Sequence, residues 1–377
     1  MSAQTISHER LNLLAEESAQ QYHVLKSELN GAIAFPRTYN KAEHKLVTSN
    51  SDWWCSGFYP GSLLYLYELN GDTVLYHEAQ RLLIPLAKEQ FNTSTHDLGF
   101  MMYCSFGNAN RLQPNPEYNQ ILINSAKSLA SRFNPKVGCI RSWNSKPEDF
   151  LVIIDNMMNL EMLFWATTVT GDSTYAKIAI THANTTMKNH FREDYSSYHV
   201  LNYNPQTGAV QQKRTAQGYA DGSAWARGQA WGLYGFTVMY RETRDLKYLE
   251  QAKHIAGFIL NNPHLPKDMI PYWDFDAPDI PNARRDASAA AVMCSALLEL
   301  QKYVPSTLSE EYLNAAKTMF NSLSSKKYRV EKGENGGFIL DHSLGNFPQK
   351  SEIDVPLSYA DYYYLEALKR MKDITTN

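Results

Sequence analysis

The stretch NGDTVLYHEA, residues 70–79, decides the fold class because close variants of it recur along the chain. The copies are TGDSTYAKIA at 170–179, TRDLKYLEQA at 243–252 and SEEYLNAA at 309–316, with a weaker echo, NPEYNQILINSA, at 115–126. Each copy has a turn residue, an acidic residue suited to a helix N-terminus, and a tyrosine followed by alanine about one helical turn later. The repeat therefore predicts a series of similar amphipathic helices.

More apolar helical runs alternate with these copies. They are GFYPGSLLYLYEL, LGFMMYCSFGNA, NMMNLEMLFWATTV, RGQAWGLYGFTVMYRE, SAAAVMCSALLELQKYV and LSYADYYYLEALKRM. Alternation of this kind describes a repeating α-hairpin protein. We predict an all-α fold, an (α/α)6 toroid, because an open solenoid would need polar capping repeats that the sequence lacks. Strand signals are scarce, and the best is SSYHVLNYNP at 196–205.

The length and charge of the chain limit its organisation and partners. Its 377 residues are 44% hydrophobic, which is enough for a large core. We expect a single catalytic domain over residues 1–377, with residues 1–40 forming a helical segment that closes the outer ring. The net charge of -3 gives no basic surface for nucleic acid, and charged residues are well mixed, so no membrane anchor is visible.

The start of the chain and its cysteines bear on location. The opening residues, MSAQTISHERLNLLAEE, lack the basic and apolar regions of a signal peptide. We therefore expect a soluble protein, cytoplasmic as written or periplasmic where a signal peptide has been removed, and either a monomer or a weak homodimer. Four scattered cysteines without paired metal spacing indicate free buried thiols. No metal or organic cofactor is expected.

Polar side chains gather just before or at the starts of the predicted inner helices. In a ring of parallel inner helices those starts point to one end, where helix N-termini add positive potential suited to an anionic ligand. The residues are Asp52, Trp53, His96, Asp97, Asp155, Arg227, Gln229, Trp231, Arg285, Asp286, Tyr359 and Asp361. They predict one aromatic funnel of mixed charge.

A carboxylate pair carries the predicted chemistry. Asp97 stands in THDLGF, and Asp155 follows the apolar run LVII. Apolar walls and a second carboxylate both disfavour ionisation, so one of the pair is expected to hold a proton near neutral pH, as a general acid requires. The alternative for each is an N-cap, which accepts a backbone N–H. Phosphate loops, zinc-protease motifs and the serine-hydrolase elbow are absent from the sequence.

Several further residues suggest a sugar-binding site, each with a structural alternative. Arg227 and Trp231 in WARGQAWGLYGF suit a carboxylate-bearing ring, although a structural arginine beside a buried indole fits the same pattern. Trp53 and Trp143 are expected to stack on a sugar face, with core packing as the alternative. His199 fits a catalytic or a structural histidine equally well.

With these residues assembled, the chain resembles the unsaturated glucuronyl hydrolases, glycoside hydrolase family 88. The matching segments occur in the family's order over roughly residues 40 to 370. They are SDWWCSGFYPG, THDLGF, VIIDNMMNLEMLFWA, DYSSYH, QGYADGSAWARGQAWGLYGF, PYWDFDAP, RRDASAAA and ADYYYLEAL. The fold that the resemblance implies is an (α/α)6 barrel.

The resemblance also implies a role for each matching residue. Asp155 corresponds to the general acid and base, and Asp97 to its partner carboxylate. The implied substrate contacts are His199, Gln217, Arg227 and Trp231, with Trp53 and Trp143 as stacking residues. His96 is added as a substrate-binding candidate because it stands beside Asp97 at the predicted rim. The implied substrate is a small oligosaccharide from a polysaccharide lyase, with a 4,5-unsaturated uronic acid at its non-reducing end. Asp155 would protonate C4 of the vinyl ether, and water would add at C5.

Two departures concern the source of the substrate. Ala216 stands where some relatives that prefer sulfated glycosaminoglycan carry a basic residue. The segment HSLGNFPQK at 342–350 is expected to bring Lys350 to the substrate subsite next to the uronate, although it matches the sulfate-binding loop of those relatives only in part. Chondroitin- or hyaluronan-derived disaccharides are therefore the first expectation. Competing functions are an unsaturated rhamnogalacturonyl hydrolase acting on pectin fragments, a sugar epimerase, and a non-catalytic carbohydrate-binding toroid.

Overall fold

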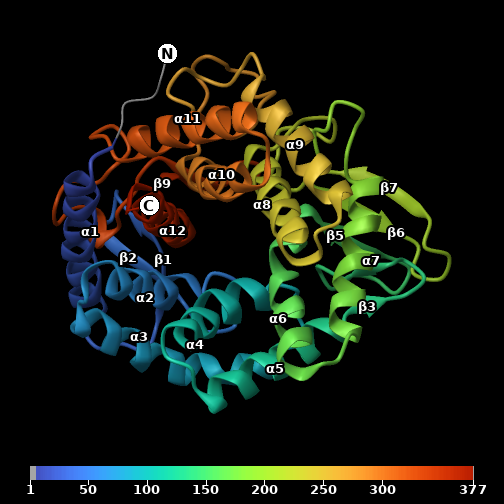
Figure 1. Cartoon of the computed structure of the whole chain (residues 1–377), viewed down its shortest axis with the longest axis horizontal. Coiled ribbons are helices and arrows are strands. Elements are labelled where there is room, and N and C mark those ends of the chain that lie inside the picture. Colours follow the sequence, from blue (N-terminus) through green and yellow to red (C-terminus); the bar gives the residue numbers. More distant parts are fainter. Residues whose placement is uncertain (1–5, 377) are drawn as a thin grey trace.

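The chain folds into two concentric rings of helices (Figure 1), in a computed structural model that describes residues 6–376. The inner ring consists of α2 (Phe58–Asn70), the π-helical segment η2 (Gly99–Gly107) with α4 (Asn108–Leu112), the 3-10 turn η3 (Ile154–Asn159) with α6 (Glu161–Thr170), α8 (Ala226–Thr243), α10 (Ala287–Leu300) and α12 (Ser358–Thr376). The outer ring consists of α1 (His8–Leu29), α3 (Thr73–Leu86), α5 (Pro116–Ala130), α7 (Thr174–Asn189), α9 (Leu246–Leu260) and α11 (Ser306–Leu323). The predicted (α/α)6 toroid is confirmed.

The first helix completes the outer ring. α1 packs against α2 and α12, the first and last inner helices, so that the two ends of the described chain meet. Residues 1–5 and 377 of the expected domain, and hence the first residues of the expected N-terminal segment, lie outside the described residues.

The recurring Gly-Asp pair explains the tight turns between inner and outer helices. Gly71 and Gly171 follow α2 and α6 with positive φ values of 78° and 74°, which end those helices, and Asp72 accepts the first N–H groups of α3. Arg244 takes the same left-handed conformation after α8, at φ 57°, where a non-glycine residue costs about 1 kcal/mol. The repeat thus encodes a helix stop followed at once by a helix start.

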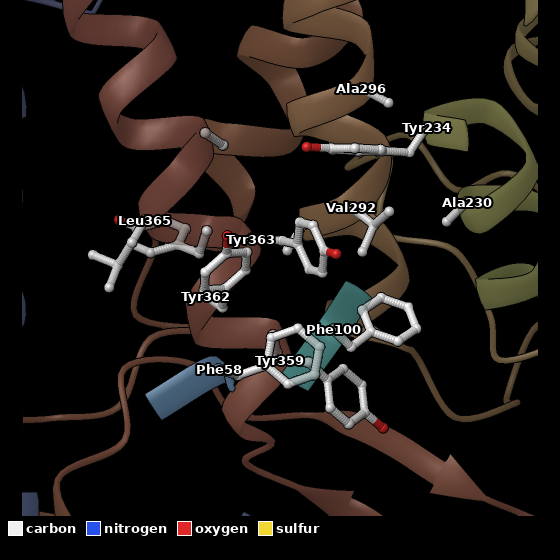
Figure 2. Packing of buried hydrophobic residues seen from close by; sticks show 14 of the residues in the cluster. Phe58, Phe100, Ala230, Tyr234, Val292, Ala296, Tyr359, Tyr362, Tyr363 and Leu365 are labelled. Atoms are coloured by element: carbon white, nitrogen blue, oxygen red, sulfur yellow. The ribbon is translucent and has the colours of Figure 1, made fainter. Parts of the chain in front are cut away.

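Burial separates the two rings. Every residue of α10 is buried, whereas α3 buries one stripe, in which Leu75, Ala79 and Leu82 are spaced at helical intervals. Aromatic side chains from the inner helices fill the barrel centre, where Phe58 lies against Phe100 and Tyr359 at ring-centroid distances of 5.4 and 5.9 Å (Figure 2). This packing gives the inner helices fixed positions around the barrel axis.

Short strands lie in the segments that connect the helices. Antiparallel pairs join β1 (Phe35–Asn40) to β2 (Lys45–Ser49), β3 (Phe133–Asn134) to β4 (Cys139–Ile140) and β8 (Ser343–Asn346) to β9 (Ser351–Val355). A three-stranded sheet has the order β5 (Phe150–Ile153), β6 (Val200–Tyr203), β7 (Val210–Arg214), with Phe150 opposite Tyr203. The strand expected within 196–205 is confirmed as β6.

Two further findings bear on the sequence expectations. All four cysteines are free, and Cys55, Cys139 and Cys294 are buried. Within residues 6–376, no helix combines the length and the apolar character that crossing a bilayer requires.

Candidate active site

A cavity of about 540 Å³ opens at the end of the barrel where the inner helices begin. Loops before α2 and η2, the turn after β5, the starts of α8 and α12, the 214–217 loop and the β8–β9 hairpin all contribute to it. Its lining residues are Arg37, Trp53, Trp54, His96, Asp97, Trp143, Ile153, Asp155, Arg214, Ala216, Gln217, Arg227, Gly345, Asn346, Gln349, Ser351, Glu352 and Tyr359. Six of the twelve residues predicted to form a funnel line this cavity, namely Trp53, His96, Asp97, Asp155, Arg227 and Tyr359. The prediction was wrong for the other six, which do not line it: Asp52, Gln229, Trp231, Arg285, Asp286 and Asp361.

The end of β5 places Asp155 at the cavity wall. Backbone N–H groups fix the approach, because Ile153 donates to Ser142 Oγ at 3.0 Å and Ile154 donates to the His199 carbonyl at 3.1 Å. The chain then enters the 3-10 turn η3, whose start has no side-chain cap. The N-cap alternative for Asp155 is thus excluded. The apolar stretch 150–166 is a strand, a turn and a helix rather than one helix.

The surroundings of Asp155 favour its protonated form. Burial raises the pKa of Asp155 to about 7, the nearby Asp97 carboxylate adds to the rise, and the Arg227 cation opposes it. The Oδ2 atom is buried and has no hydrogen-bond partner among residues 6–376. A carboxyl group in this state retains a proton near neutral pH and has a free oxygen from which to donate it.

His199 approaches Asp155 as a neutral ring. Its Nδ1 accepts the backbone N–H groups of Ala216 and Gln217 at 3.2 and 3.3 Å, which leaves the proton on Nε2. Burial lowers the pKa of His199 well below its ordinary value, and the Arg227 cation lowers it further. Nε2 lies 3.6 Å from Asp155 Oδ2. The imidazole therefore presents an N–H, not a charge, to the carboxyl group.

Asp97 and His96 form another part of the cavity wall. His96 Nε2 lies 3.2 Å from Asp97 Oδ1 without the geometry of a hydrogen bond, and Thr95 Oγ1 donates to Asp97 Oδ2 at 2.9 Å. Burial lowers the pKa of His96 below its ordinary value, although Asp97 pulls in the other direction. Asp97 caps no helix, because η2 begins without a side-chain cap. Both side chains face the cavity.

Arg227 fits both of the roles that the sequence allowed, a structural arginine and a positive charge at the binding site. It is almost fully buried, and its Nη1 donates to Asp286 at 2.9 Å while its Nη2 donates to the Gly345 carbonyl at 2.7 Å. The guanidinium also lies 4.6 Å from the Trp225 ring centroid. Arg227 thus anchors the β8–β9 hairpin, and its edge at the cavity supplies positive charge there.

Two of the three tryptophan candidates line the cavity and the third does not. Trp53 and Trp143 line the cavity, and Trp53 lies 4.5 Å from the Arg37 guanidinium. Trp231 is fully buried against Phe100 and does not line the cavity, so direct contact with a ligand is closed to it in this conformation. Trp231 acts on Asp155 instead, because its indole N–H favours the carboxylate and so lowers the pKa of Asp155.

Other candidates have structural roles or lie outside the cavity. Gln217 lines the cavity and donates to the Gly345 carbonyl at 3.2 Å, whereas Lys350 is exposed at the β8–β9 turn and does not line the cavity.

Gln229 and Asp361 have structural roles. Gln229 accepts from Ser197 at 2.6 Å, and Asp361 accepts the backbone N–H groups of Ile339 and Leu340. These last two residues fix loops and do not reach the site.

Sequence reasoning missed part of the wall. Arg37 and Glu352 form an ion pair of 2.8 Å, although they stand 315 residues apart on β1 and β9. No local pattern marks either residue, because only closure of the ring brings the strands together. Trp54 was available to sequence reasoning, since it is adjacent to Trp53. Among residues 6–376, no group of three potential ligands is arranged to hold a metal ion.

A partly buried arginine, Arg132, connects two of the loops that lead to the cavity. Arg132 Nε donates to the Arg141 carbonyl at 2.8 Å, while its Nη1 and Nη2 donate to the carbonyls of Thr93 and Ser142 at 2.5 and 3.1 Å. One of these loops leads to Asp97 and the other carries Trp143. Arg132 thereby holds both loops at the end of α5.

A second cavity, of about 500 Å³, lies toward the opposite end of α12. Its buried carboxylates all have partners. Glu366 accepts from the hydroxyls of Tyr65 and Tyr234 at 3.1 and 2.9 Å, and Glu161 is paired with Arg241. Since no carboxyl group here is left to donate or accept a proton, the first cavity is the candidate active site.

Comparison with known proteins gives consistent matches. The profile of Glycosyl Hydrolase Family 88 matches residues 31–374. An unsaturated glucuronyl hydrolase of Formosa agariphila is 48% identical over 347 residues, which cover 91% of this chain and 86% of that protein. An unsaturated chondroitin disaccharide hydrolase of Streptococcus pyogenes is 33% identical, with 89% and 85% covered. The crystal structure of an unsaturated glucuronyl hydrolase specific for heparin superposes with a TM-score of 0.92 at 48% identity, covering 97% and 98% of the two chains.

Proposed function

Because the chain belongs to glycosyl hydrolase family 88 and is a glycoside hydrolase, we propose that it removes the 4,5-unsaturated uronic acid from the non-reducing end of small lyase-generated oligosaccharides. The ring would act as one catalytic domain. The proposed reaction is hydration of the C4=C5 double bond and not direct attack on the glycosidic bond, so the usual relation between carboxylate separation and stereochemistry does not apply.

One observation carries the proposal, namely the state of Asp155. A buried carboxyl group with a pKa of about 7 and an oxygen without a hydrogen-bond partner is able to give a proton to carbon near neutral pH. A site that only bound sugars would gain nothing from such a group, since a buried carboxyl without a partner costs stability.

The steps assign one proton and one water molecule to Asp155. The protonated carboxyl donates to C4, which leaves positive charge shared between C5 and the ring oxygen. The resulting carboxylate then takes a proton from a water molecule that bonds to C5. The hemiketal so formed opens to a ketone, and the anomeric carbon releases the remaining sugar. Asp155 ends the cycle protonated, ready for the next substrate.

The neighbouring side chains support these steps. The Nε2–H of His199, 3.6 Å from Oδ2, would stabilise the carboxylate once the proton has left. Asp97 is proposed to bind sugar hydroxyls. Arg227 and Gln217 are proposed to bind the carboxylate of the uronate at their end of the cavity. Trp53 and Trp143 would face the sugar rings, with His96 beside them. Lys350, at the exposed turn, would meet only the far end of a longer substrate.

Glycosaminoglycan is the proposed source of the substrate. The 48% identical solved structure is described as specific for heparin, and a 33% identical relative is named for chondroitin disaccharide. Arg37 is neutralised by its ion pair with Glu352, but Arg214 adds positive charge to the cavity, which suits an acidic oligosaccharide. We therefore expect heparin-derived products to be turned over at least as well as the chondroitin and hyaluronan products that the sequence alone favours.

A panel of lyase products tests the function. Unsaturated disaccharides from heparin, chondroitin, hyaluronan and pectin are incubated separately with the enzyme, and loss of the ultraviolet absorbance of the conjugated double bond is followed. Loss with a glycosaminoglycan product, absent in Asp155→Asn, supports the proposal. Turnover of the pectin product alone would favour a rhamnogalacturonyl hydrolase, and binding without absorbance loss would identify a non-catalytic toroid.

A further inference from the structure

A third hollow, of about 420 Å³, lies on the outer side of the loops that Arg132 connects. It is formed at the end of α5, by β3, by the loop before Asp97 and by the start of β5. Its lining residues are Thr93, Ser131, Arg132, Phe133, Asn134, Arg141, Asn144 and Phe150. Two arginines therefore share a hollow whose lining contains no carboxylate.

The charge of Arg132 is poorly compensated. Its donors are occupied by the backbone carbonyls of Thr93, Arg141 and Ser142 and by the Asn144 side chain, none of which is charged. Burial lowers the pKa of Arg132 to about 10, the neighbouring Arg141 cation lowers it further, and the Asp97 carboxylate opposes them only in part. A negative charge bound in the hollow would offset the repulsion between the two arginines.

Arg141 offers the donors that Arg132 lacks. Its guanidinium lies over Phe150, with Cζ 4.7 Å from the ring centroid, so its polar edge is left for other partners. Among residues 6–376 it makes neither an ion pair within 4 Å nor a side-chain hydrogen bond. A stacked arginine with free donors beside a second cation is the arrangement that binds oxyanions.

We propose that this hollow is a binding site for an oxyanion of the sulfate or phosphate class, held by Arg141 and by the positive field of Arg132. The site is separate from the active-site cavity, because the two share no lining residue. The Arg141–Asn144 loop lies between them, since Trp143 faces the active site while Arg141 and Asn144 line the hollow. The proposal does not depend on the identity of the substrate.

Thermal unfolding with sodium sulfate as the probe tests the site, with sodium chloride at equal ionic strength as the reference. A ligand that binds only the folded state raises the unfolding midpoint as its concentration rises. We expect sulfate to raise the midpoint of the native enzyme above the chloride reference and Arg141→Gln to abolish that increase. Arg244→Gln is the matched control, because Arg244, although more exposed than Arg141, also lies over an aromatic ring, with Cζ 5.7 Å from the Tyr240 centroid. This variant should keep the full increase.

Arg214→Gln separates the hollow from the active site, since Arg214 lines only the latter. An increase that survives in Arg141→Gln but disappears in Arg214→Gln would overturn the proposal, as would an equal effect of sulfate and chloride on the native enzyme. Glucose 6-sulfate against glucose distinguishes the source of the anion. A shift with the ester that Arg141→Gln removes assigns a sulfated saccharide, and a shift with inorganic sulfate alone assigns the free ion.

Discussion

The two ends of the barrel both enclose buried carboxylates in cavities of similar size, yet they treat them in opposite ways. α12 runs from one to the other, since Tyr359 lines the candidate active site while Glu366 and Arg370 line the opposite cavity. At that opposite end, ion pairs link Glu161, Arg241, Glu299 and Arg370 in a continuous network. At the active-site end, Asp155 Oδ2 has no hydrogen-bond partner among the described residues.

The comparison shows that burial alone does not identify a catalytic acid. Burial raises the pKa of Glu161 above its ordinary value just as it raises that of Asp155. Glu161, however, is held by Arg241, so its proton affinity serves no exchange with a ligand. What distinguishes Asp155 is that it lines an open cavity while its buried Oδ2 has no hydrogen-bond partner among residues 6–376.

The largest expected effect is on turnover in Asp155→Asn. An amide cannot donate the proton that C4 needs, and loss of a general acid typically lowers the rate by about 10³-fold or more. Initial rates with an unsaturated disaccharide measure the loss, and circular dichroism checks the fold. Glu161→Gln is the matched control at the opposite end, where the rate per folded molecule should not change. Near-native turnover in Asp155→Asn at an intact fold would refute the proposed mechanism.

The same substitution, Asp155→Asn, should stabilise the protein relative to the native enzyme more and more as pH rises from 4 to 8. The folded-state pKa of Asp155, about 7, lies above its ordinary value, so the fold favours the protonated form. The stability contribution is present in full below the unfolded-state pKa and is lost as pH rises through 7, with an upper bound of about 4 kcal/mol. Asparagine stays neutral throughout, so Asp155→Asn should gain stability over the native enzyme between pH 4 and 8, as measured by urea unfolding.

Asp361→Asn provides the contrast for that experiment. Burial raises the pKa of Asp361 also to about 7, but its carboxylate accepts the N–H groups of Ile339 and Leu340 and the Tyr22 hydroxyl. An amide loses one of those acceptor oxygens, so this variant should be less stable than the native enzyme at pH 8. Equal gains in the two variants would mean that the missing partner is not what distinguishes Asp155.

Much of the fold and part of the candidate site were predictable from the sequence. The repeated Gly-Asp turns and the alternating apolar runs predicted the toroid, because helix caps and helical periodicity are local signals. Asp97 and Asp155 were expected together because both precede inner helices, which start at one end of a ring. Arg37, Glu352 and the carbonyl contacts of Arg227 were not predictable, since they arise where β1, β8 and β9 meet after closure. Burial of Trp231 was one of two alternatives that the sequence left open, because core and cavity tryptophans occupy the same helical spacing.

An effect of about 3 kcal/mol on the free energy of unfolding is expected for Arg370→Met, at the paired end. Arg370 Nη2 lies 2.9 Å from Glu299 Oε2 and 3.5 Å from Glu366 Oε1, and removing one partner of a largely buried ion pair leaves uncompensated charge. Urea unfolding measures the loss, while the rate per folded molecule should be unchanged. Lys253→Met is the control, since its more exposed pair with Glu250 is worth about 0–1 kcal/mol. A rate loss as large as that of Asp155→Asn would show that the two ends are not independent.

The smallest effect is expected at His199, which faces Asp155 without bonding to it. If its Nε2–H stabilises the carboxylate that forms after proton transfer, His199→Gln should lower the turnover number about tenfold, in line with the 1.5 kcal/mol or more of a hydrogen bond to a charged group. His182→Gln is the matched control, because His182 is also a buried histidine whose Nδ1 accepts a backbone N–H, from Ile140 at 3.0 Å, and it lines no part of the cavity. Both variants lose a similar structural contact, so a common loss of stability is expected and only His199→Gln should lose rate. If both variants lose rate equally, His199 acts by holding the 214–217 loop and not through its N–H.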